Sequence, residues 1–231
     1  MIKKYLLDKK HRIPRVWSNI ELKKVAHYFE GDIINVSAYM DEDKEGYIYG
    51  KDYFVTAKSY SCSNYDSDKR GFQGSLSNEY FLDLECVLDV ELVGKYDVVF
   101  NHTTLEHIFN FKMAFSNLCA LSKNYVILIV PFLQEQHADY GDYWRFSPTA
   151  IKLMFKEQGL ETVYINYNDG PNESIYVFAI AAKNPGSVLA KKIENTEGNK
   201  VDIIDSYLIG SKIIKNNILH KFFSLLKRYS P

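Results

Sequence analysis

Apolar positions along the chain follow two patterns, short continuous runs and runs that repeat every three or four residues. The continuous runs predict buried strands at Asp32–Ser37, Tyr96–Asn101, Tyr125–Val130, Thr162–Tyr167 and Ile175–Ala182. Two shorter and more mixed runs, Ser59–Asn64 and Tyr80–Leu84, are weaker strand candidates. The periodic runs predict amphipathic helices at Asn19–Phe29, Leu105–Leu121 and Thr149–Gln158.

Residues at the ends of these runs predict where the helices begin and end. Ser18 and Glu21 have the spacing of a capping box, so the first helix is expected to begin at Asn19 and to end before Gly31. Pro148 opens the third helix and Gly159 ends it. Strands that alternate with helices predict an α/β domain with a mostly parallel sheet and helices on both faces. The last two strands follow each other without a helix, so they should form an antiparallel hairpin.

Composition excludes several classes of protein. The chain has 231 residues, of which 46% are hydrophobic, 25% charged and only 12 glycine, which is typical of a folded globular protein. Its 28 basic and 29 acidic side chains give no basic excess, so no nucleic-acid partner is expected. The three cysteines have no metal-ligand spacing, which predicts reduced thiols and no metal. The longest apolar run is too short to span a bilayer, so a cytoplasmic location is expected.

Four segments carry a resemblance to a known family. Residues 96–107 read Tyr-Asp-Val-Val-Phe-Asn-His-Thr-Thr-Leu-Glu-His, and they are followed by Leu118–Phe132, Gly141–Pro148 and Lys156–Leu160. In this order and spacing the segments resemble class I S-adenosylmethionine-dependent methyltransferases of the small-molecule type. The similarity covers Ser18 to Asn184. It implies a Rossmann-like sheet of seven strands in the order 3-2-1-4-5-7-6 with strand 7 antiparallel, in agreement with the predicted hairpin.

The resemblance also implies S-adenosylmethionine as cofactor, bound where the strand order reverses. In the family, glycines in the loop after the first strand let the backbone approach this cofactor closely. The corresponding loop has no glycine before Gly46. The contacts that the resemblance implies are Asn35, Ser37 and Ala38 in the loop, Asn64 or Asp66 for the ribose, Asp83 and Leu84 for the adenine, and Asn101 and His102 after the fourth strand. The missing glycines leave an alternative, a methyltransferase-like binding or scaffold protein that has lost its cofactor.

Candidate catalytic residues follow the fourth and fifth strands. Methyl transfer needs mainly positioning, and a general base helps when the acceptor is a hydroxyl. His107, His137 and Asp142 are candidates, because they are expected near the reaction centre. An acceptor that is a small molecule or a sugar could contact a cluster of aromatic and guanidinium groups, namely Tyr140, Tyr143, Trp144 and Arg145. The alternative is that Trp144 pins this loop to the core and Arg145 pairs with a carboxylate.

The resemblance stops near Gly186, so residues 1–186 are predicted as the methyltransferase-like domain and residues 187–231 as a separate tail. From Lys200 to the end, the tail has six Lys or Arg residues against Asp202 and Asp205. Its apolar residues recur at helical spacing, which predicts a basic amphipathic helix. Such a helix either attaches to the inner face of a membrane or docks on the domain or on a second copy of the chain.

Overall fold

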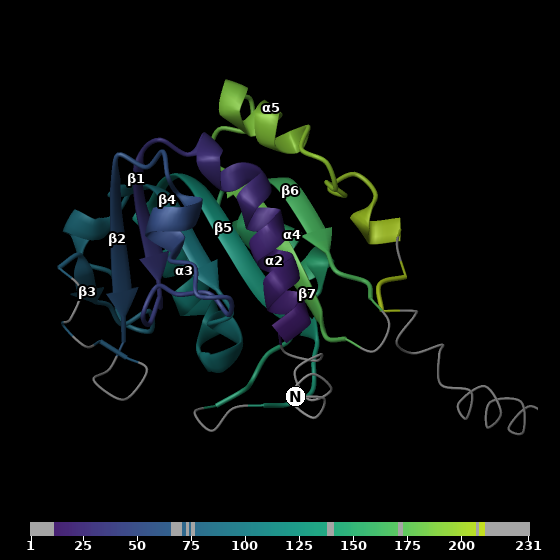
Figure 1. The fold of residues 1–231 in the computed structure, drawn as a ribbon, viewed down its shortest axis with the longest axis horizontal. Coiled ribbons are helices and arrows are strands. Elements are labelled where there is room, and N and C mark those ends of the chain that lie inside the picture. The colour runs from purple at the N-terminus through teal and green to yellow at the C-terminus, as the bar shows by residue number, and fades with distance from the viewer. Residues whose placement is uncertain are drawn as a thin grey trace, which may run out of the picture.

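The computed structural model describes residues 12–65, 71, 72, 74, 77–137, 141–170, 173–206 and 208–210. Seven strands form one mixed sheet in the order β3-β2-β1-β4-β5-β7-β6 (Figure 1), with β7 antiparallel to both of its neighbours. The predicted order and the reversed strand are therefore confirmed. The strands are β1 Asp32–Val36, β2 Ser59–Asn64, β3 Glu79–Phe81, β4 Tyr96–His102, β5 Ser122–Leu133, β6 Glu161–Tyr167 and β7 Ile175–Ala182.

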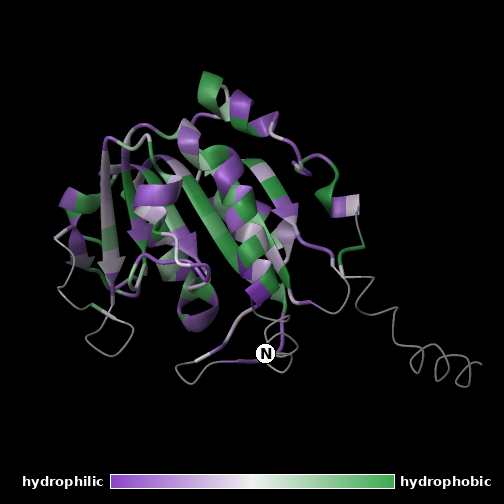
Figure 2. Cartoon of the chain, in the orientation of Figure 1, coloured by the Kyte–Doolittle hydropathy of each residue, from purple (hydrophilic) through white to green (hydrophobic). Residues whose placement is uncertain are grey.

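Helices cover both faces of this sheet, as the sequence predicts. α2 (Arg12–Val25) and α5 (Val188–Glu194) bury apolar side chains on one face, and α3 (Phe111–Leu121) and α4 (Pro148–Glu157) on the other. Figure 2 shows hydrophobic residues concentrated in the central strands and hydrophilic ones on the outward helix surfaces. Short helical turns complete the described chain, namely Ala26–Tyr28, Tyr49–Tyr53 (π type), Val90–Leu92, Leu105–His107 and Ile204–Ser206.

The first helix is longer than predicted, and the prediction that Ser18 and Glu21 form a capping box at its start is wrong. α2 already includes Arg12, so Ser18 and Glu21 lie within it rather than at its start. Both side chains are buried: the Ser18 hydroxyl donates to the carbonyl of Arg15 at 2.9 Å, and the Glu21 carboxylate accepts from the Tyr164 hydroxyl at 2.5 Å. The capping-box spacing here serves contacts between α2 and the sheet.

The second predicted helix, Leu105–Leu121, is interrupted. A 3-10 turn at Leu105–His107 is followed by α3, which begins only at Phe111. The indole of Trp144 donates to the carbonyls of Ile108 and Phe109, both at 3.1 Å. These carbonyls are consequently bonded to a distant side chain, and the helical path begins after them.

The segment after Gly186 begins with contacts to the domain. α5 packs against β6 with Ala190 and Ile193 buried, and the Asn199 amide bonds along the β6 edge through Val163 O (2.9 Å) and Ile165 N (3.0 Å). The basic amphipathic stretch from residue 211 lies outside the described residues, so its role stays a prediction. Within the described ranges, no helix has the length and apolar character needed to cross a membrane.

Candidate active site

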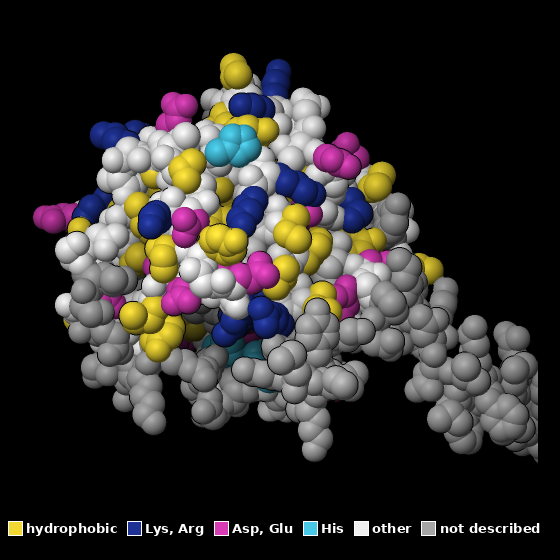
Figure 3. Space-filling view, in the orientation of Figure 1, with side chains coloured by type: hydrophobic (Ala, Val, Ile, Leu, Met, Phe, Trp, Pro, Cys, Tyr) yellow, Lys and Arg dark blue, Asp and Glu magenta, His cyan; other side chains and the backbone are white. Residues whose placement is uncertain are grey.

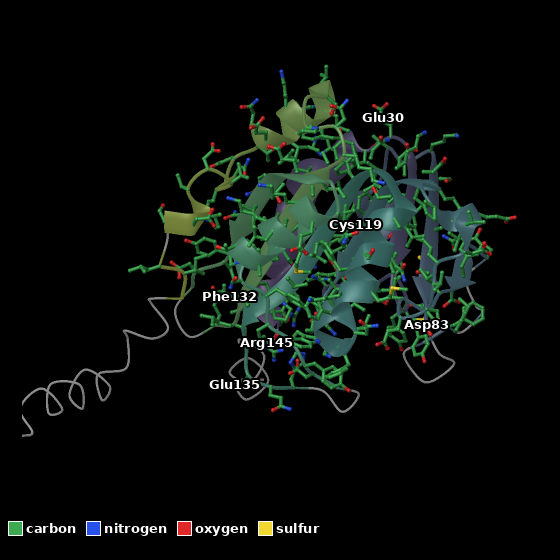
Figure 4. All side chains as sticks on the ribbon, turned by 180° about the vertical axis from the view of Figure 1, so that it is seen from behind. Glu30, Asp83, Cys119, Phe132, Glu135 and Arg145 are labelled. Carbon is green, nitrogen blue, oxygen red and sulfur yellow. The ribbon has the colours of Figure 1, made fainter. Side chains whose placement is uncertain are left out.

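The candidate site lies at the carboxyl ends of β1 and β4, where the strand order reverses. The chain leaves β1 toward β2 on one side and returns through β4 on the other, and ligands bind at such switch points in open α/β sheets. Figure 4 shows Asp83, Glu135 and Arg145 near the same lower edge of the molecule, with Glu30 at the opposite edge. The predicted site residues follow strands that end at this lower edge.

The loop after β1 takes left-handed backbone conformations without glycine. Ser37, Tyr39 and Asp41 have φ angles of 62°, 53° and 56°. Each such residue costs about 1–2 kcal/mol relative to glycine. The surrounding structure holds the path: the Ala38 amide donates to the carbonyl of Ser63 at 3.1 Å, and the Asp41 amide donates to the carbonyl of Ala38 at 2.9 Å.

Asp41 anchors the loop from within. Its carboxylate is buried and accepts from the Asn35 amide (2.7 Å), the Tyr60 hydroxyl (2.7 Å) and the Gly50 backbone (2.9 Å). Burial raises the pKa of Asp41. The Asn35 side chain is itself buried and bonded to Asp41, so it supports the loop rather than facing a ligand.

Asn64, one candidate for the ribose, makes three hydrogen bonds within the protein. Its amide accepts from the Tyr39 backbone N–H at 2.6 Å and donates to the Tyr39 carbonyl at 3.0 Å. It also donates to Glu79 at 2.6 Å. Asn64 therefore holds the loop after β1, and both N–H groups of its amide are used within the protein. The other candidate, Asp66, lies outside the described residues.

Asp83 and Leu84 lie beyond the end of β3, where the resemblance places the adenine. The Asp83 carboxylate is half-buried; it accepts from the Glu85 amide at 2.8 Å and from the Cys86 thiol at 3.1 Å. Leu84 is buried, and its carbonyl accepts from the Asn117 amide at 2.9 Å. The turn is thus rigid, with the backbone of Leu84 fixed against α3.

Asn101 and His102 end β4 on opposite faces of the sheet. The Asn101 amide is buried and donates to the carbonyl of Val36 at 2.9 Å, while its own oxygen has no partner among the described residues. The His102 ring lies between the Ser18 hydroxyl (3.0 Å) and the Tyr49 hydroxyl (3.2 Å). Burial and the charge of Arg15 hold the pKa of His102 well below its ordinary value, so the ring is neutral.

His107 and His137 come together although 29 positions separate them, with ring centroids 5.2 Å apart. His107 Nδ1 donates to the carbonyl of Gly141 at 2.6 Å, and burial lowers its pKa. His137 Nδ1 lies 3.2 Å from Asp142 Oδ2, which also accepts from the His137 backbone at 2.6 Å. The Asp142 carboxylate therefore lies beside the His137 ring.

Arg145 stabilises the loop that carries Asp142 through several hydrogen bonds. Its guanidinium donates to both Asp142 oxygens (2.5 and 2.7 Å) and to three backbone carbonyls, those of Gln134, Glu135 and Trp144. Burial alone would raise the pKa of Asp142, but these bonds lower it to about 2. The low pKa makes Asp142 a weak base for taking a proton from an acceptor hydroxyl. Arg145 pairs with a carboxylate, as the alternative interpretation of this residue predicted.

Trp144 and Tyr143 differ in their surroundings. Trp144 is anchored by its indole bonds and packs on Phe111 with centroids 4.8 Å apart, which agrees with the interpretation that it pins the loop. Tyr143 is 51% exposed and lies edge-on to Phe109, itself 68% exposed, at 5.3 Å. These two rings form an exposed aromatic surface. Tyr140 lies outside the described residues.

Two charged residues at this edge were not among the predicted site residues. Glu106 is 1% exposed, with Oε1 3.7 Å from His107 Nε2 and no partner for Oε2 in the described part of the chain. Burial raises its pKa to about 8. Arg15 on α2 interacts electrostatically with Tyr176 on β7 and with Glu106. Glu106 belongs to the Leu-Glu-His motif, so the sequence could have indicated it as a site residue. Arg15 precedes the predicted first helix, and no motif indicates it.

Comparisons with known proteins agree with the geometry. No family model and no curated protein matches the chain. A Bacillus halodurans C-125 protein whose methyltransferase assignment is provisional matches 71% of this chain and 97% of its own, at 12% identity and a TM-score of 0.54. A protein from Listeria monocytogenes, provisionally an S-adenosylmethionine-dependent methyltransferase, matches 73% and 98% at 12% identity and 0.53.

A third structure was solved with ligands. The 1,6-didemethyltoxoflavin-N1-methyltransferase of Burkholderia thailandensis, with 1,6-didemethyltoxoflavin and S-adenosylhomocysteine bound, matches 79% of this chain and 87% of its own, at 11% identity and a TM-score of 0.50. Identities this low establish the fold alone. The chain has the class I methyltransferase fold.

Proposed function

We propose that the chain is an S-adenosylmethionine-dependent methyltransferase whose acceptor is the hydroxyl of a small molecule, specifically a sugar. The observation that carries the proposal is the loop after β1. Ser37, Tyr39 and Asp41 give it the left-handed path that glycines allow in the family, at the switch point of the sheet. The protein maintains this path with buried hydrogen bonds despite its conformational cost, which supports a functional role for the loop.

The residues at the switch point fit the cofactor in part. The backbone at Ser37 and Ala38 would line its methionine end, and the turn at Asp83 and Leu84 would hold the adenine. The unpartnered oxygen of Asn101, buried beside the Val36 carbonyl, offers a further acceptor. When bound, S-adenosylmethionine supplies an electrophilic sulfonium methyl group. Both N–H groups of Asn64 are bonded within the protein, so the ribose would be held mainly by another group.

His137 is the residue best placed to take the acceptor's proton. The Asp142 carboxylate lies 3.2 Å from its Nδ1, and Arg145 binds that carboxylate in turn. With S-adenosylmethionine bound as the methyl donor, the acceptor's hydroxyl proton would pass to His137, and S-adenosylhomocysteine would be the leaving group. The exposed rings of Phe109 and Tyr143 would stack on the apolar face of a sugar ring. These contacts support a sugar as the acceptor.

Calorimetric titration with S-adenosylhomocysteine tests the cofactor directly. We expect saturable binding with one site per chain, and a rise in melting temperature that follows the ligand concentration. If millimolar ligand produced neither heat nor a thermal shift, the enzyme proposal would fail. The chain would then be a methyltransferase-like binding or scaffold protein.

Replacing His137 with glutamine should lower methyl transfer by about 100-fold or more, because a positioned base contributes roughly 10²–10⁴ to such a step. The affinity for S-adenosylhomocysteine should not change, since the ring lies on the acceptor side. Transfer of labelled methyl groups to a panel of sugars measures the rate, and titration measures the affinity. His27→Gln, an exposed histidine after α2, is the matched control. Equal loss of rate and affinity in H137Q would instead assign the ring to the cofactor.

A further inference from the structure

The segment that follows β3 has an exposed apolar side. Residues 85–93 read Glu-Cys-Val-Leu-Asp-Val-Glu-Leu-Val, and three valines among them are largely exposed, namely Val87 (86%), Val90 (81%) and Val93 (55%). Residues three apart lie on one side of a 3-10 turn, and Val90–Leu92 is such a turn. The leucines between the valines, Leu88 and Leu92, pack against the hydrophobic core instead. One apolar side of this segment is therefore covered by the domain, and the other is exposed.

The charges on residues 85–93, here called the acidic segment, are all negative. Glu85, Asp89 and Glu91 are exposed, and the segment contains no lysine or arginine. In the described part of the chain, none of these three carboxylates forms an ion pair. The α2 face in Figure 3 is different, because Lys and Arg side chains are interspersed there with Asp and Glu. An exposed apolar surface that carries only negative charge suits a partner that is basic and apolar.

The last residues of the chain have the matching composition. Residues 211–231, here called the basic stretch, contain no aspartate or glutamate and five basic side chains, namely Lys212, Lys215, Lys221, Lys227 and Arg228. Apolar residues between them recur at helical spacing, which predicts a helix with an apolar face and basic flanks. The acidic segment and the basic stretch are therefore complementary in charge, and both offer apolar side chains.

The basic stretch of the same chain is poorly placed for the acidic segment. It follows Gly210, which lies against Leu133 at the end of β5. Figure 4 shows the neighbouring Phe132 well apart from Asp83, which precedes the acidic segment. β3 lies four strands from β5 in the sheet, or about 19 Å at 4.8 Å per strand. A helix rises 1.5 Å per residue, so about 13 residues would be used before β3 is reached. The basic stretch of a second copy has no such constraint.

We propose that the chain forms a two-fold dimer in which the basic stretch of each copy docks on the acidic segment of its partner. Such a reciprocal exchange covers both exposed valine surfaces and brings opposite charges together twice. The inference concerns assembly and is independent of the proposed function, because none of these residues is assigned to the cofactor or the acceptor.

Charge reversal in the full chain tests this dimer, with light scattering during gel filtration as the measurement. We expect the unmodified chain to be dimeric at micromolar concentration and to dissociate as salt is raised. Asp89→Lys/Glu91→Lys, the segment variant, and Lys215→Glu/Lys221→Glu, the stretch variant, should each weaken dimerisation by at least about tenfold, because like charges then face each other. An equimolar mixture of the two variants should restore the dimer, since each reversed surface then meets a complementary one.

The matched control is Glu157→Lys/Glu161→Lys, which reverses two exposed acids outside the acidic segment and should leave the dimer intact. Thermal unfolding checks that the variants fold, and the stretch variant keeps the test decisive if the segment variant does not. A monomeric unmodified chain would overturn the proposal, as would a dimer that withstands both reversals or a mixture that stays monomeric. A monomer that sediments with phosphatidylserine vesicles through Lys215 and Lys221 would assign the basic stretch to a membrane instead.

Discussion

Replacing Ser37 with valine is expected to weaken S-adenosylhomocysteine binding by at least about tenfold, whereas Ser37→Gly should preserve or tighten it. Ser37 has a φ of 62°, a conformation that a β-branched residue adopts only with strain. The extra strain of about 1–2 kcal/mol is enough to shift the loop and to lose a factor of ten in affinity. Glycine removes the strain that serine already carries. Calorimetry gives the affinities, and thermal unfolding gives the stabilities.

Ser37→Ala is the matched control, because it removes the hydroxyl without branching the side chain. Its affinity should lie between those of the glycine and valine variants. The order Gly, Ala, Val reports the backbone requirement, since the three side chains differ mainly in how they tolerate positive φ. If all three variants bound equally well, the loop after β1 would not line the cofactor.

Much of the fold could be predicted because its strands are buried on both faces. β7 is buried along its whole length and β5 along most of its length, so each appears in the sequence as a continuous apolar run. Helix boundaries were harder, because they depend on distant partners. α3 begins late because Trp144 takes the carbonyls of Ile108 and Phe109, and no local pattern shows that.

The candidate site was predictable in its residue types but not in its pairings. The sequence indicated His137, Asp142 and Arg145 as chemically active groups, yet their bonds to one another depend on how a loop folds back. Asn64 fits a ribose contact by position, but its amide closes on the Tyr39 backbone. Ser37 adopts a positive φ although it is not glycine, and no local pattern in the sequence indicates this.

Replacing Glu106 with glutamine should stabilise the protein at pH 8 by about 2 kcal/mol and give no gain near pH 4.5. Burial raises the pKa of Glu106 from 4.5 to about 8, so the folded state keeps a proton that the unfolded state has lost. Stability therefore falls as the pH rises between these values, by about 5 kcal/mol at most. Glutamine removes this loss but buries an amide in its place, which costs about 1–3 kcal/mol. Urea unfolding at pH 4.5, 6.5 and 8 measures the difference.

The sign of this effect also shows whether Glu106 is ionised and paired with Arg15. If Glu106 were ionised and paired with Arg15, glutamine would leave a buried guanidinium without its partner and would destabilise the protein at pH 8. If Glu106 is protonated, glutamine stabilises the protein at pH 8. Glu30→Gln, an exposed glutamate at the opposite edge of the sheet (Figure 4), should show neither effect. Destabilisation of E106Q at pH 8 would therefore contradict the neutral carboxyl.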